Sequence, residues 1–156
     1  ALRDILQPTF IGWRGIRMDT TGNPIGWKSD GTKFEVATSA FPLFRGLSAA
    51  IRLHQTWGNP TQRYQRICQL SERLWSNLKK IPGVNCLRTT PPESGLVSFT
   101  VEDGNHGALV QALEAQQMMV RLIVNPNCVR ACVHYLTLES EVDEFTLQLQ
   151  ILLKPT

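Results

Sequence analysis

Apolar residues recur along the chain with two different periods, which predict helices in some segments and strands in others. Between residues 43 and 81 they recur every three or four positions, as on one face of a helix. Pro42 is suited to begin a first helix that ends at Gly58, and residues 59–62 (Asn-Pro-Thr-Gln) have the N-cap, proline and glutamine of a second helix start. This second helix should end at Pro82-Gly83 and bury Tyr64, Ile67, Ser71, Leu74, Leu78 and Ile81.

Short apolar runs in the second half of the chain predict a small sheet. They cover residues 84–88, 96–101, 119–124 and 128–134. A helical pattern from Ala108 to about Gln117 separates the second run from the third, and Thr137 is suited to cap a last helix. The predicted order α-α-β-β-α-β-β-α is an α+β fold in which helices pack on a small sheet.

Residues 1–42 lack this periodicity. They contain two tryptophans and five glycines, with turn signals at residues 22–24 (Gly-Asn-Pro) and 29–31 (Ser-Asp-Gly). Segments so rich in turn residues seldom build a core of their own, and usually lie against a larger body or a partner subunit. The sequence therefore predicts an irregular strap over residues 1–42 and a small domain over residues 43–156.

Composition excludes several classes of protein. The chain has 156 residues, of which 42% are hydrophobic, enough for one ordinary core. No apolar run approaches the roughly 20 residues of a membrane span, and residues 1–7 lack the features of a signal peptide, so no membrane partner is expected. The four cysteines lack zinc-ribbon spacing, which predicts no metal site and favours buried free thiols in a cytoplasmic protein.

The net charge of +3 hides an uneven distribution. Residues 36–90 contain eight basic residues and one acidic residue, whereas residues 91–156 contain three and eight. The basic side chains of the second predicted helix lie along one side: Arg63, Arg66, Arg73 and Lys80. Such a stripe can bind nucleic acid. Neither a recognition module nor interleaved aromatic residues accompany it, so a solvated helix face is favoured and no nucleic-acid partner is expected.

Two arginines interrupt the apolar runs of the third and fourth predicted strands. Arg121 and Arg130 are costly there unless each guanidinium is paired or reaches a site, and a guanidinium can hold a carboxylate with two hydrogen bonds. The alternative is an edge strand whose solvent face carries arginine. Thr38 and Ser39 precede the first predicted helix, where hydroxyl and N–H groups can bind a phosphate, although an ordinary helix start also explains them.

Three segments, in this order, resemble the C-terminal region of class V aminotransferase-type enzymes, the group that includes cysteine desulfurases and cystine C–S lyases. Residues 34–38 (Phe-Glu-Val-Ala-Thr) resemble the family's F-E-x-G-T, with Ala37 in place of glycine. Val120-Arg121 resembles the V-R that ends a small-domain strand. Residues 130–143 resemble R-x-S-x-x-x-Y-N-T-x-x-E-I-D, with Cys132 in place of serine and other residues in place of Y-N-T: Leu136, Thr137 and Leu138.

The resemblance implies the small C-terminal domain of a fold-type I enzyme that uses pyridoxal 5'-phosphate, usually as a homodimer, with a strap from the large domain. Arg130 would bind the α-carboxylate of an amino-acid substrate, and Arg121 would lie near the same substrate. Thr38, with Ser39 beside it, would contact the cofactor phosphate of the neighbouring subunit. The cofactor lysine would lie upstream of Ala1, so no catalytic residue is expected in this chain, which alone should be inactive. Sulfur-accepting or iron–sulfur assembly proteins are the partners that such an enzyme implies.

Desulfurases of this group carry a nucleophilic cysteine on a loop between the V-R strand and the carboxylate-binding arginine. Here only residues 122–129 lie between Arg121 and Arg130, and their one thiol, Cys128, begins a predicted strand. A lyase that β-eliminates sulfur from cysteine or cystine, giving pyruvate, ammonia and a sulfur or persulfide product, is therefore favoured. A cysteine desulfurase, a related class V aminotransferase or epimerase, and a non-catalytic amino-acid-binding module are the alternatives.

Overall fold

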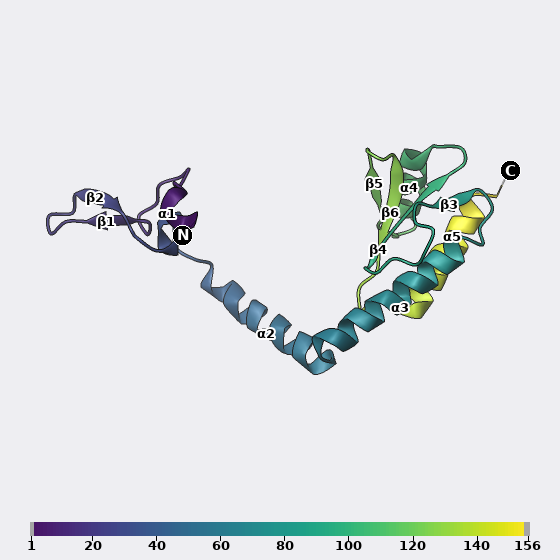
Figure 1. Ribbon diagram of the computed structural model, residues 1–156, viewed down its shortest axis with the longest axis horizontal. Helices are drawn as coiled ribbons and strands as arrows, with labels where there is room; N and C mark the ends of the chain where they lie inside the picture. Colours follow the sequence, from purple (N-terminus) through teal and green to yellow (C-terminus); the bar gives the residue numbers. More distant parts are fainter. Residues whose placement is uncertain (1, 155–156) are drawn as a thin grey trace. The chain divides into compact units, whose positions relative to one another are not determined.

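The computed structural model describes residues 2–154, which form two compact units (Figure 1). Unit 1 extends to Leu53 and unit 2 begins at His54. Their boundary lies inside helix α2 (Phe41–Trp57), close to its C-terminal end. The assignment of residues 1–42 to the large domain of an enzyme stays a prediction.

Unit 1 contains a β-hairpin that the sequence pattern did not reveal. Its strands are β1 (Ile16–Met18) and β2 (Pro24–Trp27), preceded by the short helix α1 (Leu2–Ile5) and followed by the 3-10 helix η1 (Gly31–Phe34). The carboxylate of Asp19 organises the turn, because its Oδ1 accepts the N–H groups of Thr21 at 2.9 Å and of Asn23 at 2.8 Å. These hydrogen bonds lower the pKa of Asp19, and the one from the N–H of Asn23 has the largest effect.

No apolar side chain of residues 2–53 is buried. The buried side chain of this unit is that of Lys33, whose Nζ donates hydrogen bonds to the carbonyl oxygens of Arg3 and of Leu6, the latter at 2.7 Å. Chain segments approach closely at Gly12, where an added Cβ would lie 1.7 Å from the carbonyl oxygen of Val36. Such a surface, with exposed side chains such as Phe10, Trp13 and Leu43, is typical of a segment covered by another protein body.

Unit 2 has the predicted order of elements. After α2 come α3 (Pro60–Leu78), β3 (Val84–Cys86), β4 (Leu96–Val101), α4 (His106–Ala115), β5 (Arg121–Ile123), β6 (Cys128–Cys132) and α5 (Glu139–Leu152). The strands form one antiparallel sheet in the order β3-β4-β6-β5, with α3, α4 and α5 packed on it (Figure 1). The predicted α+β fold is thus confirmed, and β6 is a central strand whereas β5 lies at the edge.

The core of unit 2 lies between the helices and one face of the sheet. Its most deeply buried side chains come from every layer: Leu70, Leu74, Leu78, Val97, Phe99, Leu113, Val129 and Leu149. The predicted burial of Tyr64 is wrong, since this residue is 52% exposed and its hydroxyl donates to the carbonyl oxygen of Glu93. The buried side chains of α3 all come from its second half, which is the part that covers the sheet.

The two predicted helix starts have different outcomes. The capping box of α3 is confirmed, because the Asn59 side chain accepts from the N–H of Gln62 while the Gln62 side chain accepts from the N–H of Asn59, both at 2.9 Å. Thr137 does not cap α5. Its hydroxyl instead accepts from the N–H of His134, and the helix begins after Leu138, whose N–H donates to Glu141 at 2.7 Å.

Two residues of the basic stripe, Arg66 and Arg73, are paired with carboxylates of α5. Arg66 pairs with Glu139 at 2.7 Å, and Arg73 binds both carboxylate oxygens of Asp143, at 2.6 and 2.8 Å. Two of the four stripe residues therefore face α5 instead of solvent alone. The uneven charge along the sequence thus becomes a complementary pairing of two helices in the fold.

Replacing Asp143 by asparagine should lower the thermal unfolding midpoint at pH 7 by a few degrees, because it removes the charge that pairs with Arg73. The hydrogen bonds from Arg73 hold the pKa of Asp143 below its usual value. The stabilisation of the fold by ionised Asp143 is therefore fully present above the pKa of an unfolded aspartate, about 3.9. It is lost as pH falls through the lower pKa of the folded state. Thermal unfolding measured between pH 7 and pH 2 should show the difference shrinking with acid.

The matched control is Glu144→Gln on the same helix, whose carboxylate bonds only to Gln148 within residues 2–154. This variant should unfold like the parent protein. Equal midpoints for Asp143→Asn and the parent at pH 7 would contradict the prediction.

The four cysteines are free thiols, as expected, but they are not all buried. Cys128 is buried, Cys68 and Cys86 are half-buried, and Cys132 at the end of β6 is exposed. Within residues 2–154 no helix is both long and apolar enough to cross a membrane.

Candidate functional site

Arg121 and Arg130, nine positions apart in sequence, are direct neighbours across two strands. In the register of β5 and β6, Arg121 is paired with Arg130, and in the register of β4 and β6, Ser98 is paired with Arg130. Residues paired across antiparallel strands point to the same face of the sheet. The three side chains therefore form one row, which we call the arginine row.

The arginine row lies on the sheet face opposite the core. Val97 and Phe99, on either side of Ser98, are 1% and 0% exposed, and Val129 and Ala131, on either side of Arg130, are also buried in the core. Because alternate residues of a strand point to opposite faces, Ser98 and Arg130 point away from the helices. Arg130 is half-buried and Arg121 is exposed.

Neither guanidinium of the row has a carboxylate or hydrogen-bond partner among residues 2–154. Like charges placed directly opposite one another in a sheet are destabilising. An anion between them would offset this repulsion, and a carboxylate can accept two parallel hydrogen bonds from one guanidinium. An arginine on the solvent face of an edge strand was the alternative explanation. It applies to Arg121, which is on the edge strand β5, but not to Arg130, which is on the central strand β6.

The connection between the two arginine strands is short. β5 ends at Ile123 and β6 begins at Cys128, so residues 124–127 alone form the turn. Cys128 is 2% exposed and is paired in register with Ile123. A cysteine fixed in a strand at the base of a four-residue turn cannot travel as a nucleophile on a mobile loop would.

Thr38 and Ser39 lie in unit 1, ahead of the first turn of α2, and the arginine row lies in unit 2. Thr38 is exposed, and the Ser39 hydroxyl accepts a hydrogen bond from Arg14 at 2.9 Å. Arg14 also pairs with Glu35 at 2.8 Å. Hydroxyls and a guanidinium ahead of a helix N-terminus are groups that bind phosphate, so the local chemistry fits the phosphate of pyridoxal phosphate.

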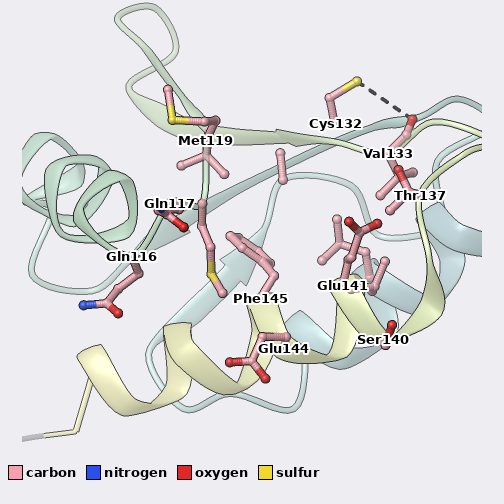
Figure 2. Close-up of a pocket in the computed structure, with 15 residues that line it drawn as sticks. Gln116, Gln117, Met119, Cys132, Val133, Thr137, Ser140, Glu141, Glu144 and Phe145 are labelled. Carbon is pink, nitrogen blue, oxygen red and sulfur yellow. Dashed lines mark hydrogen bonds between the residues drawn. The ribbon is translucent and has the colours of Figure 1, made fainter.

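A groove elsewhere in unit 2 has different chemistry (Figure 2). It has a volume of about 670 Å³ and lies between residues 116–120, the end of β6 and α5. Figure 2 shows Glu141 and Phe145 reaching from α5 towards it, whereas the Cys132 thiol points away from α5. Neither Arg121 nor Arg130 lines the groove, and its charged lining residues are carboxylates, Glu141 and Glu144. An amino-acid carboxylate would be repelled there.

Ser98 and Arg14 lie beside the candidate site residues and were not predicted from the sequence. Strand alternation in residues 96–101 could have placed Ser98 on the open face, but nothing in the sequence gives the register that sets it beside Arg130. Arg14 is 25 positions from Ser39, and the contact depends on the fold of unit 1. Neither has a local sequence signal.

The family of the chain follows from comparison with known proteins. Residues 1–144 match the model of the aminotransferase class-V family. The chain belongs to this family. The predicted family resemblance is therefore confirmed, and the arginine row and the Thr38 segment can be considered as parts of a class-V fold.

Among solved structures, the chain is 49% identical to the cystine C–S lyase C-DES in complex with its reaction product cysteine persulfide, with a TM-score of 0.83. A mutant of C-DES with glycine covalently linked to its pyridoxal-phosphate cofactor gives the same identity and TM-score. The alignments cover 92% of this chain but only 38% and 37% of those chains. The chain therefore spans well under half the length of these relatives.

A cysteine desulfurase from Thermococcus onnurineus NA1 is 23% identical, with a TM-score of 0.76 over 97% of this chain and 40% of that one. This likeness shows a shared fold. No curated protein gives a significant match.

Proposed function

We propose that the chain is the C-terminal part of a pyridoxal-phosphate-dependent carbon–sulfur lyase. The full-length enzyme would β-eliminate sulfur from cysteine or cystine and release pyruvate, ammonia and a sulfur or persulfide product. The observation that carries the proposal is the arginine row, in which two guanidiniums lie side by side on the open face of the sheet with no ion-pair partner among residues 2–154. Identity of 49% to the cystine C–S lyase C-DES supports the same substrate class.

Each arginine has a proposed task. Arg130, half-buried on a central strand, binds the α-carboxylate with its planar fork and so fixes the orientation of the substrate. Arg121, next to it on the edge strand, adds a second positive charge for the same substrate. Pyridoxal phosphate, when bound, supplies an electron sink for loss of the α-proton and of the β-sulfur group.

The residues of unit 1 would serve the cofactor. Thr38 and Ser39 offer hydroxyls to its phosphate, and Arg14, which is paired with Glu35 and bonded to the Ser39 hydroxyl, holds the Ser39 side chain in place. In the proposed homodimer this phosphate belongs to the neighbouring subunit. An enzyme that releases sulfur in this form would pass it to sulfur-accepting or iron–sulfur assembly proteins, and we place it in the cytoplasm.

The lyase is favoured over a cysteine desulfurase by the four-residue turn before Cys128 and by the burial of that thiol. A nucleophile that collects sulfur must reach the substrate and then an acceptor, which a buried strand residue cannot do. An aminotransferase or epimerase of the same family, and an amino-acid-binding module without catalysis, are less well supported because the 49% identity is to a cystine C–S lyase.

The test uses a polypeptide in which residues 1–156 follow their upstream half. Incubation with cystine or with cysteine should release pyruvate and ammonia in equal amounts, measured by a coupled assay and by ammonia determination. Mass spectrometry of the peptide that contains Cys128 should show no added sulfur during turnover. Sulfur on Cys128 without release of pyruvate would show that the enzyme is a desulfurase and not a lyase. Binding of an amino-acid carboxylate without turnover would show that the protein is a non-catalytic binding module.

A further inference from the structure

Aromatic rings gather where α2 ends and are held within unit 2. His54 and Trp57 belong to the last turn of α2, and Tyr135 follows β6. Tyr135 is 4% exposed, and its ring centroid lies 4.8 Å from that of Trp57 and 5.4 Å from that of His54. Its hydroxyl is 2.7 Å from Nδ1 of His54. The buried phenol thus satisfies its one polar atom on a histidine of α2.

Arg63 of α3 contacts both parts of this cluster. Its guanidinium lies 6.0 Å from the centroid of the Tyr135 ring. Its Nη1 donates hydrogen bonds to the carbonyl oxygens of Gly58 and of His54, the latter at 2.7 Å. Carbonyls at the end of a helix have no partner within the helix, so Arg63 caps α2. We call His54, Trp57, Arg63 and Tyr135 the α2 clamp.

All four clamp residues belong to unit 2, which begins at His54. The clamp joins the last turn of α2 to the first turns of α3 and to the segment that leaves β6, the strand of Arg130. We infer that the clamp is sensitive to protonation: it holds the last turn of α2 on unit 2 while His54 is neutral, and weakens when His54 binds a proton. This inference does not depend on the proposed reaction.

The effect of a proton follows from the groups that face His54. A neutral imidazole with its proton on Nε2 accepts the Tyr135 hydroxyl at Nδ1, whereas an imidazolium has no acceptor, and the hydrogen bond would have to reverse. The new positive charge would lie beside Arg63, which is bonded to the carbonyl of the same residue, and near His134, whose ring centroid is 6.5 Å away. Among residues 2–154 no carboxylate is bonded to His54 to offset it.

The test is hydrogen–deuterium exchange of the 156-residue chain at pH 7.5 and pH 5.5, with rates corrected for intrinsic exchange. Histidine ordinarily changes charge within this range. Amides of residues 54–63 should lose about five- to tenfold of their protection at pH 5.5, the effect of one hydrogen bond. Protection in β4 and β6 should not change, because the acidic groups paired between α3 and α5 keep their charge at this pH.

Two variants distinguish the effect of protonating His54 from other effects of low pH on the exchange rates. His54→Gln cannot bind a proton but keeps an acceptor for Tyr135, so its protection should be the same at both pH values. His134→Gln removes a neighbouring ring but leaves the His54–Tyr135 hydrogen bond and the Arg63 contact in place, so it should keep most of the pH-dependent loss. The inference fails if the parent chain shows equal protection at both pH values, or if His54→Gln loses protection in acid as the parent does.

Discussion

Replacing Arg130 by glutamine should lower kcat/KM of the proposed full-length lyase for cystine by about thirtyfold or more. Removing one partner of a hydrogen-bonded charge pair costs about 2 to 5 kcal/mol, which corresponds to about thirtyfold to several thousandfold. Glutamine keeps a polar group at the position but has neither the charge nor the planar fork that can bind both carboxylate oxygens. Steady-state kinetics with cystine and with cysteine measure the change.

The fold should tolerate this substitution. Arg130 faces Arg121 directly across β5 and β6, so removing one guanidinium removes a repulsion, and the thermal unfolding midpoint should not fall. Arg130→Lys, which keeps the charge without the fork, should lie between glutamine and arginine. Arg88→Gln changes an exposed arginine outside the row and should leave kcat/KM unaltered. A loss of less than fivefold for Arg130→Gln would show that Arg130 does not bind the carboxylate.

The fold of unit 2 was predictable because its elements have strong local signals. The Asn59–Gln62 capping box, the break at residues 82–83 and the alternation in β4 each depend on neighbouring residues. Tyr64 was misplaced because helical periodicity shows which face is apolar but not how far along α3 the sheet extends. The hairpin of unit 1 was missed because β1 and β2 are short and lack alternating apolar positions.

The sequence predicted the residues of the candidate site only in part. Each arginine could be singled out as a charge within an apolar run, but their pairing depends on the register of β5 and β6, which the sequence pattern does not fix. The α2 clamp had no signal at all, since His54 and Tyr135 are 81 positions apart. Contacts between distant segments decide the chemistry here, and local patterns cannot supply them.

The 156-residue chain alone should show no turnover of cystine or cysteine. The proposed reaction needs a lysine that can bond covalently to the cofactor, and the chain has five lysines: Lys28, Lys33, Lys79, Lys80 and Lys154. Lys33 is buried and bonded to two carbonyl oxygens, and the ammonium of Lys79 lies over the Trp75 ring. None of the five lysines belongs to the arginine row, where a substrate held by its carboxylate would be.

The measurement is the near-visible absorbance of the chain after addition of pyridoxal phosphate and dialysis, followed by borohydride and determination of the intact mass. We expect no retained band and no mass increase, whereas the longer polypeptide should retain a band that borohydride abolishes and should gain the mass of one reduced cofactor. Surface lysines react only weakly and reversibly with an aldehyde, so dialysis before reduction separates them from a built site. Turnover, or a cofactor fixed by borohydride to a lysine of the 156-residue chain, would place the catalytic lysine inside this chain and overturn the assignment of an upstream one.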